Sequence, residues 1–152
     1  MDDSITKHLK AYQLGYELHE VKDHISAIKC KNILLKDHQG AYYFITTFPN
    51  KKLSIESLKI FIGVPSLEYA EEKELQEQLH LSNAASSILG FLNDQPNLTT
   101  AMIDQDLLYE DSVAVQANNE HETLVFNGET FQRLIQSLPQ QTIIVPLEGE
   151  LE

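Results

Sequence analysis

The chain has a single cysteine, Cys30, among its 152 residues, so it cannot form an internal disulfide bond. Such sparse cysteine usage fits a reducing compartment, and we expect the protein to be cytoplasmic. It contains no run of 18 apolar residues, so no membrane-spanning segment is expected. Residues 1–8 lack a basic stretch followed by an apolar one, so no signal peptide is expected either.

Basic residues are also scarce. The chain holds 11 Lys and Arg against 23 Asp and Glu, which gives a net charge of −12 and argues against broad nucleic-acid binding. The deficit is uneven, because residues 22–59 carry a balance of +4 and residues 60–152 a balance of −14. One side of the fold could therefore meet a phosphate backbone. The alternative is an ordinary solvated surface with an acidic bias.

Several catalytic and binding motifs are missing. The sequence has neither G-x-x-x-x-G-K-[ST] nor G-x-G-x-x-G, which excludes the common phosphate-binding loops. It has no H-E-x-x-H, and its six histidines are scattered, so we expect no metal and no cofactor. Ser86 and Ser87 precede Gly90 without the G-x-S-x-G pattern of a nucleophile elbow. Cys30 precedes a predicted strand, where a cysteine more often packs as a small apolar residue than acts as a nucleophile.

Residues 30–49 form the clearest predicted hairpin. Residues 32–36 and 41–48 are apolar and aromatic runs, and the four residues 37–40 between them end in Gly40, which tolerates a positive φ. Lys31 stands at the mouth of the first strand. A cation there faces either solvent or a cleft. In the first case Lys31 is an ordinary surface lysine at the edge of a strand.

The rest of the chain alternates between helical and extended patterns. Ser4, Ser54, Asp104 and Asn127 are expected to cap helices. The helices are predicted from residue 5 to a stop at Gly15, and over residues 55–62, 70–79, 105–108 and 129–138. Further strands are predicted over residues 16–21, 66–69, 98–103, 113–117, 123–126 and 142–145, with a small-residue loop at 80–90 and a turn at 95–97. This order predicts one α+β domain, residues 1–146, with a mixed sheet, followed by a loose acidic tail, residues 147–152.

The segment Cys30–Asp37, the Gly40 turn and the aromatic strand after it resemble the opening of the YbaK/ProX-type prolyl-tRNA synthetase-associated editing domain. The likeness continues in one order over about residues 27–146, through Gly90–Asp94 and Ala101–Asp104. This resemblance implies a mixed, largely antiparallel sheet flanked by helices, with a cleft at its centre. It also implies an aminoacyl-tRNA deacylase, in the branch that clears alanine from proline tRNA.

Site residues follow from the same resemblance. Lys31 would be the catalytic residue and contact the tRNA terminus or the esterified carbonyl, with Asn32 helping to hold that position. The loop at 82–90 would present backbone N–H groups and shape the aminoacyl pocket; its matched positions are Ala84, Ser86, Ser87 and Gly90. The implied partners are the 3′ terminus of an aminoacyl-tRNA and an aminoacyl-tRNA synthetase.

The chemistry of ester hydrolysis is consistent with these residue types. Negative charge develops on the carbonyl oxygen, and preorganised donors stabilise it. The terminal adenosine supplies its own 2′-hydroxyl, so neither a protein nucleophile nor a metal is required. A small pocket excludes larger side chains by sterics, although it discriminates weakly over one methylene.

The sequence departs from the family pattern at several positions. Ala84 and Ile88 stand where members carry the Gly and Pro of a G-x-x-x-P loop. Gln116 replaces a histidine; it can still hydrogen-bond to a substrate but cannot act as an acid or base near neutral pH. The nearby His121 is the candidate to substitute for that histidine, so both residues are expected at the substrate-binding site. The segment between Val21 and Lys29 is shorter than in typical members, which place a helix there.

Three readings therefore stay open. The first is hydrolysis of a mischarged aminoacyl-tRNA. The second is a catalytically weakened relative that binds tRNA or a synthetase without hydrolysis. The third is hydrolysis of a different small aminoacyl ester in a remodelled pocket.

Overall fold

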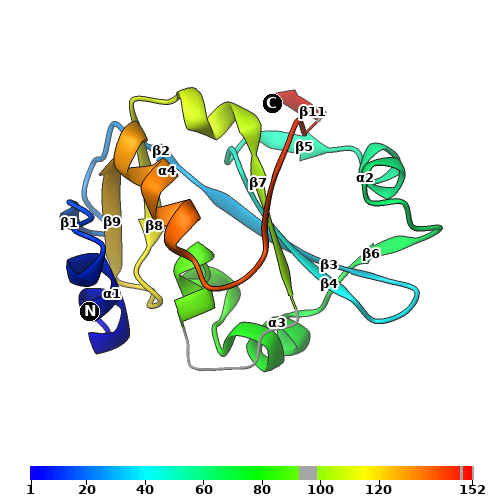
Figure 1. Cartoon of the computed structure of the whole chain (residues 1–152), viewed down its shortest axis with the longest axis horizontal. Helices are drawn as coiled ribbons and strands as arrows, with labels where there is room; N and C mark the ends of the chain where they lie inside the picture. Colours follow the sequence, from blue (N-terminus) through cyan, green and yellow to red (C-terminus); the bar gives the residue numbers. More distant parts are fainter. Residues whose placement is uncertain (93–98, 148, 152) are drawn as a thin grey trace.

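The computed structural model describes residues 1–92, 99–147 and 149–151, and its α+β architecture agrees with the predicted fold class (Figure 1). The helices are α1 (Asp3–Ala11), α2 (Ile55–Ile62), α3 (Glu72–Leu79) and α4 (Gly128–Ser137), with short 3₁₀ helices η1 (Asn83–Ala85), η2 (Ile88–Leu92) and η3 (Gln105–Tyr109). The strands are β1 (Glu17–Glu20), β2 (Ile28–Lys29), β3 (Lys31–Asp37), β4 (Tyr42–Thr47), β5 (Lys51–Leu53), β6 (Leu67–Tyr69), β7 (Thr100–Asp104), β8 (Ser112–Gln116), β9 (Glu122–Asn127), β10 (Thr142–Val145) and β11 (Gly149–Leu151).

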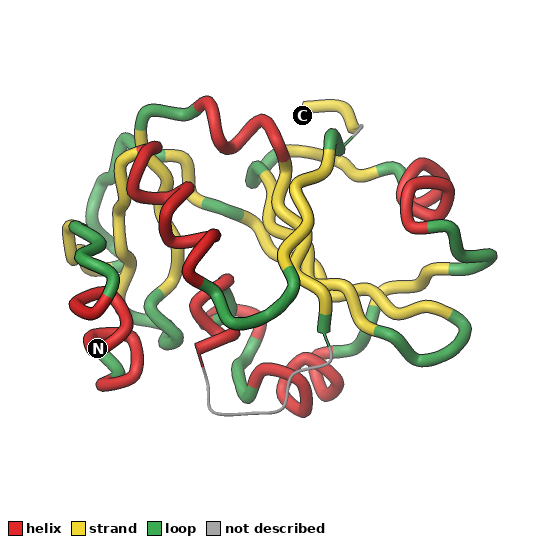
Figure 2. The backbone as a smooth tube through the Cα atoms, in the orientation of Figure 1, coloured by secondary structure: helices red, strands yellow, loops and turns green. Residues whose placement is uncertain are grey.

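The strands of the described residues form two main sheets where the sequence predicts one. A four-stranded sheet has the order β1-β9-β8-β2, and a five-stranded sheet has the order β10-β7-β4-β3-β6. Most pairings are antiparallel; the β2–β8, β4–β7 and β7–β10 pairings are parallel. The chain passes from the first sheet to the second at Cys30, between β2 and β3 (Figures 1 and 2). Lys31 is therefore the first residue after this crossing.

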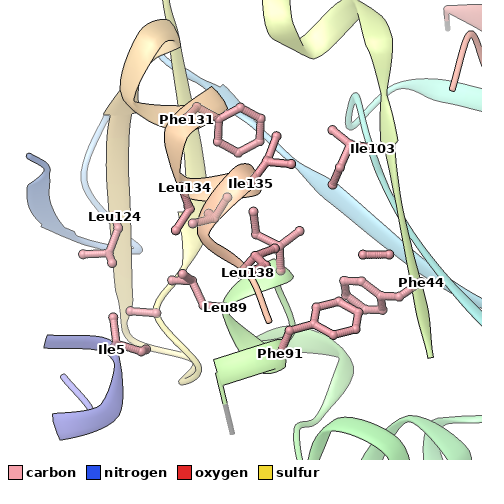
Figure 3. Packing of buried hydrophobic residues seen from close by; sticks show 14 of the residues in the cluster. Ile5, Phe44, Leu89, Phe91, Ile103, Leu124, Phe131, Leu134, Ile135 and Leu138 are labelled. Atoms are coloured by element: carbon pink, nitrogen blue, oxygen red, sulfur yellow. The ribbon is translucent and has the colours of Figure 1, made fainter. Parts of the chain in front are cut away.

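The larger hydrophobic core fills the space between the two sheets and is closed by α1, α3 and α4. Phe44 of β4 meets Phe91 of η2 edge to face, with ring centroids 5.6 Å apart, and Phe131 enters from α4 (Figure 3). A smaller core lies on the opposite face of the five-stranded sheet, where Leu58 of α2 packs over Ile45. The five-stranded sheet is thus covered on both faces, and most residues of its middle strands β4 and β7 are buried.

Three of the four predicted helix caps are confirmed, one of them being Asp104 at the start of η3. The Ser54 side chain accepts a hydrogen bond from the Ser57 N–H, and Gly63 ends α2 in the left-handed conformation with φ = 84°. The Asn127 side chain caps α4 in the same way. The prediction for the first helix is wrong by two residues, because Asp2 is the cap and accepts from the Ser4 N–H at 2.9 Å. A carboxylate also suits the positive end of the helix dipole better than a hydroxyl does.

The predicted hairpin is confirmed as β3 and β4, which pair antiparallel from Lys31 opposite Thr47 to Lys36 opposite Tyr42. Its turn is held by the Asp37 carboxylate, which accepts from the N–H groups of Gln39 and Ala41. Gly40 has φ = 81°, so glycine is needed there. This turn chemistry fixes the register and hence the position of Lys31.

The C-terminal end differs from the prediction of a loose tail, because β11 pairs antiparallel with β5. The predicted turn at residues 95–97 lies outside the described residues. Among the helices of the described ranges, none combines the length and the apolar character needed to cross a bilayer.

A charge cluster joins β3 and β4 to α3. The Glu74 carboxylate accepts from Lys36 Nζ at 2.7 Å, from the Glu71 N–H at 2.8 Å and from the Tyr42 hydroxyl at 3.0 Å. These donors, Lys36 foremost, lower the pKa of Glu74 from 4.5 to about 2. Glu74 therefore both caps α3 and attaches it to the hairpin.

This cluster predicts a pH-dependent stability. A lowered folded-state pKa contributes stability that is present above pH 4.5 and is lost as the pH falls toward 2. Glu74→Gln should thus destabilise the protein at pH 7 but cost less at pH 3, as measured by urea unfolding at both values. The exposed Glu77 on the same helix provides the control, and Glu77→Gln should change the unfolding free energy by less than about 0.5 kcal/mol. An equal cost of Glu74→Gln at both pH values would contradict the assignment.

Candidate functional site

Lys31 is half-buried, and its ammonium group has a defined position. Lys31 Nζ donates to the main-chain carbonyl of Lys51 at 2.6 Å, across from the turn that follows β4. An ammonium has three N–H donors, so up to two stay available for a ligand or water. A neutral main-chain carbonyl thus fixes the Lys31 ammonium. This bond holds the group in place without a carboxylate to compensate its positive charge.

Asn32 points to the other side of β3, because successive residues of a strand face opposite sides. Its Nδ2 donates to the Ser86 carbonyl at 3.1 Å, and its Oδ1 accepts from the Thr46 hydroxyl at 2.9 Å. Asn32 therefore ties the hairpin to the loop of residues 82–90. Lys31 and Asn32 are therefore neighbours in the sequence, but their side chains contact different parts of the fold.

The loop of residues 82–90 is more ordered and more buried than its small polar sequence suggests. It contains η1 and begins η2, and residues 85–90 are all buried, whereas Ala84 is exposed. Several of its N–H groups are used inside the loop: those of Ala85, Ser86, Leu89 and Gly90 donate to Ser82, Asn83 or Ser87. These four are therefore not the donors that the loop would offer to a ligand.

The turn between β8 and β9 holds the other side of this loop. Asn118 Nδ2 donates to the Leu89 carbonyl at 3.1 Å, and Ser82 Oγ donates to Glu120 Oε1 at 3.2 Å. Asn118 has φ = 61°, in the left-handed region that asparagine tolerates better than most residues. The loop is thus fixed between β3 and the β8–β9 turn, which brings Asn32, Ser86 and the residues around Gln116 into one region.

Within that turn, the structure gives the two remaining predicted residues different environments. Gln116 Nε2 donates to the Asn119 carbonyl at 3.1 Å, and its Oε1 accepts from the Thr123 hydroxyl at 2.9 Å. Both ends of the amide are therefore engaged in shaping the turn. His121 is exposed on the same turn, where its N–H donates to the Asn119 side chain.

Sequence reasoning missed a buried charged cluster beside Lys31. Lys51 and Asp104 are 5% and 0% exposed, with 2.8 Å between Nζ and Oδ2, and the Thr47 hydroxyl donates to the same oxygen at 2.6 Å. Asp104 also caps η3 as predicted, since its Oδ1 accepts from the Asp106 N–H. The available signal was an acid placed directly after the apolar strand of residues 101–103.

Two further features concern the site's surroundings: the segment before β2 and the cavities of the protein. Residues 21–27 form turns and loop without a helix, as the short sequence there predicts. Four cavities are lined by described residues; the largest, about 680 Å³, lies between α1 and the end of α4 and includes His8 and Ser137. None of these four is lined by Lys31, Asn32 or the described residues 82–90. Across the described residues, no group of three or more His, Cys, Asp or Glu is arranged to hold a metal ion.

Cys30 packs against the main core next to Lys31. Burial raises the pKa of its thiol, and the negative charge of Asp104 raises that pKa further. Because the thiolate is the reactive form, we expect Cys30 in the folded protein to react with a disulfide reagent at least about tenfold more slowly than in the urea-unfolded chain. Equal rates in the two states would show that the thiol is accessible and ionised, against this placement.

Comparisons with known proteins match most of this chain to one family. Residues 15–134 match the family model of the aminoacyl-tRNA editing domain. The prolyl-tRNA editing protein ProX of Acetoanaerobium sticklandii is 30% identical over 108 residues, which are 70% of this chain and 66% of that protein. Prolyl-tRNA synthetase associated domain-containing protein 1 of Danio rerio is 28% identical over 86 residues, 57% of this chain and 47% of that protein. The chain thus matches at most about two thirds of either relative.

A solved structure shares the fold over the whole chain. The crystal structure of a proposed trans-editing enzyme for prolyl tRNA synthetase superimposes with a TM-score of 0.73 at 15% identity, covering 99% of both chains. At this identity the similarity concerns the fold. The arrangement of two sheets joined at β3 is therefore also found in a protein of known structure.

Proposed function

Because the chain belongs to the aminoacyl-tRNA editing domain family, we propose that it hydrolyses the ester bond of mischarged aminoacyl-tRNA. We propose alanyl-tRNA(Pro) as the first substrate, since both relatives are named for prolyl-tRNA editing or its synthetase. Residues 1–146 would act as one editing domain in the cytoplasm, with the tRNA 3′ terminus and a synthetase as partners. The observation that carries the proposal is the half-buried Lys31 ammonium, held at the crossing between the sheets with donors left for a substrate.

The proposed reaction needs few protein groups. Water attacks the carbonyl carbon of the aminoacyl ester, and the bond from that carbon to the ribose 3′ oxygen breaks. The 3′ oxygen takes up a proton, which the neighbouring 2′-hydroxyl of the terminal adenosine can relay. Lys31 would donate to the carbonyl oxygen as its negative charge develops, which is the contribution that lowers the barrier most in such reactions.

A second candidate function is binding of aminoacyl-tRNA without hydrolysis. It is favoured by the loop of residues 82–90, whose N–H groups at four positions are already bonded internally and whose Ile88 is fully buried. It is also favoured by Gln116, since an amide bonded at both ends cannot transfer protons.

The test is release of labelled amino acid from a panel of charged tRNAs. The panel holds alanyl-, seryl- and glycyl-tRNA(Pro), with prolyl-tRNA(Pro) as the larger cognate control. Faster release of alanine than of proline supports the proposal, because a small pocket selects by size. Preferred release of serine or glycine would instead support the third reading, a remodelled pocket. If the protein binds these tRNAs but releases none of the four amino acids faster than buffer does, the result supports binding without hydrolysis.

A further inference from the structure

A row of polar residues runs from Lys31 across three strands, and its members Thr47 and Asp104 are fully buried. Lys31 lies opposite Thr47 in the β3–β4 pairing, and β7 continues the row at Asp104, which follows Ile103, the partner of Thr46. The Thr47 hydroxyl and Lys51 Nζ both donate to Asp104 Oδ2, at 2.6 Å and 2.8 Å. The row therefore shares one carboxylate oxygen between two donors from β4 and β5.

This row leads directly to the ammonium of Lys31. The side chain of Lys51 is fixed by Asp104, and the main-chain carbonyl of the same Lys51 accepts from Lys31 Nζ at 2.6 Å. A change in the position of the Lys51 ammonium relative to the Asp104 carboxylate would therefore shift the Lys51 main-chain carbonyl. Lys31 would then lose its acceptor or follow it.

Stability alone is a poor reason for a charged pair at this place. Burying two charges costs desolvation energy that the attraction between them repays only partly, and apolar residues of similar size often serve as well. Lys51 is nevertheless 5% exposed, with the exposed Asp106 at 3.5 Å and the Phe48 ring centroid at 5.6 Å. A cation held on several sides is suited to fixing a backbone position.

We infer that Thr47, Lys51 and Asp104 form a positioning cluster that sets the place of the Lys31 ammonium through the Lys51 carbonyl. They are positioning residues, because they act through Lys31 rather than on the substrate. The kinetic part of the inference rests on the proposed function. Its structural part does not.

Thr47→Val removes one donor to Asp104 at nearly constant volume, whereas Thr47→Ser keeps it. We expect Thr47→Val to lower kcat for aminoacyl ester hydrolysis about 10- to 100-fold with KM within about twofold, because small misplacements of a catalytic group are costly. Thr47→Ser should restore most of kcat. Thr130→Val, at a buried threonine of α4, is the matched control and should leave kcat unchanged.

A second measurement is independent of activity. Acylation of Lys31 by acetic anhydride, followed by mass spectrometry, reports how firmly its ammonium is held. Labelling of Lys31 should rise at least about threefold in Thr47→Val and stay at the wild-type level in Thr47→Ser and Thr130→Val. If the wild-type protein hydrolyses no aminoacyl ester, the proposed function is wrong. The extent of Lys31 labelling then tests the positioning cluster by itself. Unchanged labelling in Thr47→Val overturns it in either case, as does raised labelling with unchanged kcat in an active protein.

Discussion

Replacing Lys31 with alanine is expected to lower the rate of alanine release from alanyl-tRNA(Pro) at least about 100-fold, the usual cost of losing a donor to a developing oxyanion. The ammonium is half-buried and held at 2.6 Å from the Lys51 carbonyl, so its loss removes a fixed donor rather than a mobile charge. Single-turnover release of labelled alanine measures the effect directly.

The matched control for this change is Lys29→Ala. Lys29 is an exposed lysine of β2, two residues earlier in the same extended segment, and its loss should change the rate by less than about threefold. Both variants should unfold within about 1 kcal/mol of the wild type. Release at the wild-type rate by a folded Lys31→Ala variant would contradict the proposed catalytic role of Lys31.

Asp104→Ala is expected to have the largest effect on stability, a loss of about 3–5 kcal/mol. The change leaves the Lys51 ammonium buried without its carboxylate, and only the exposed Asp106 stays near it at 3.5 Å. Urea unfolding at pH 7 measures the loss.

Two further variants separate the buried charge from other causes. Asp106→Ala removes the exposed partner and should cost no more than about 1 kcal/mol. The double variant Lys51→Met/Asp104→Leu removes both buried charges and should recover most of the stability lost in Asp104→Ala. A double variant as unstable as the single one would mean that packing, rather than an unpaired charge, causes the loss.

The elements that the sequence predicts well are those fixed by local chemistry. The β3–β4 hairpin follows from its turn, where Asp37 and Gly40 suffice. Helix α2 follows from Ser54 and Gly63 at its ends. The predicted cap of the first helix is wrong because Asp2 and Ser4 are both good capping residues, and the sequence alone does not decide between them.

Features that depend on distant parts of the chain were not predictable. The division into two sheets depends on the crossing at Cys30 and on pairings such as β1 with β9, more than 100 residues apart. The sequence of residues 49–52 predicts a turn, and nothing in it indicates that β7 brings Asp104 against Lys51. The small residues of the segment 82–90 predict a loop, but they do not predict that Asn32 and Asn118 hold it from both sides.

The site residues show the same limit. The neighbours Lys31 and Asn32 read as one motif, yet the strand sends their side chains to opposite faces, toward Lys51 and toward Ser86. Gln116 is predicted from the sequence only as the loss of an acid or base, whereas the structure engages its amide in hydrogen bonds to Asn119 and Thr123.

The most direct measurement is NMR mapping of a non-hydrolysable substrate end, 3′-deoxy-3′-(alanylamino)adenosine, on the isotope-labelled protein. Binding should shift the backbone signals of Lys31 and Asn32, those of residues 82–90, and those of the β8–β9 turn. Shifts confined to other surfaces, such as the cavity around His8 and Ser137, would place the substrate elsewhere and contradict the role of Lys31.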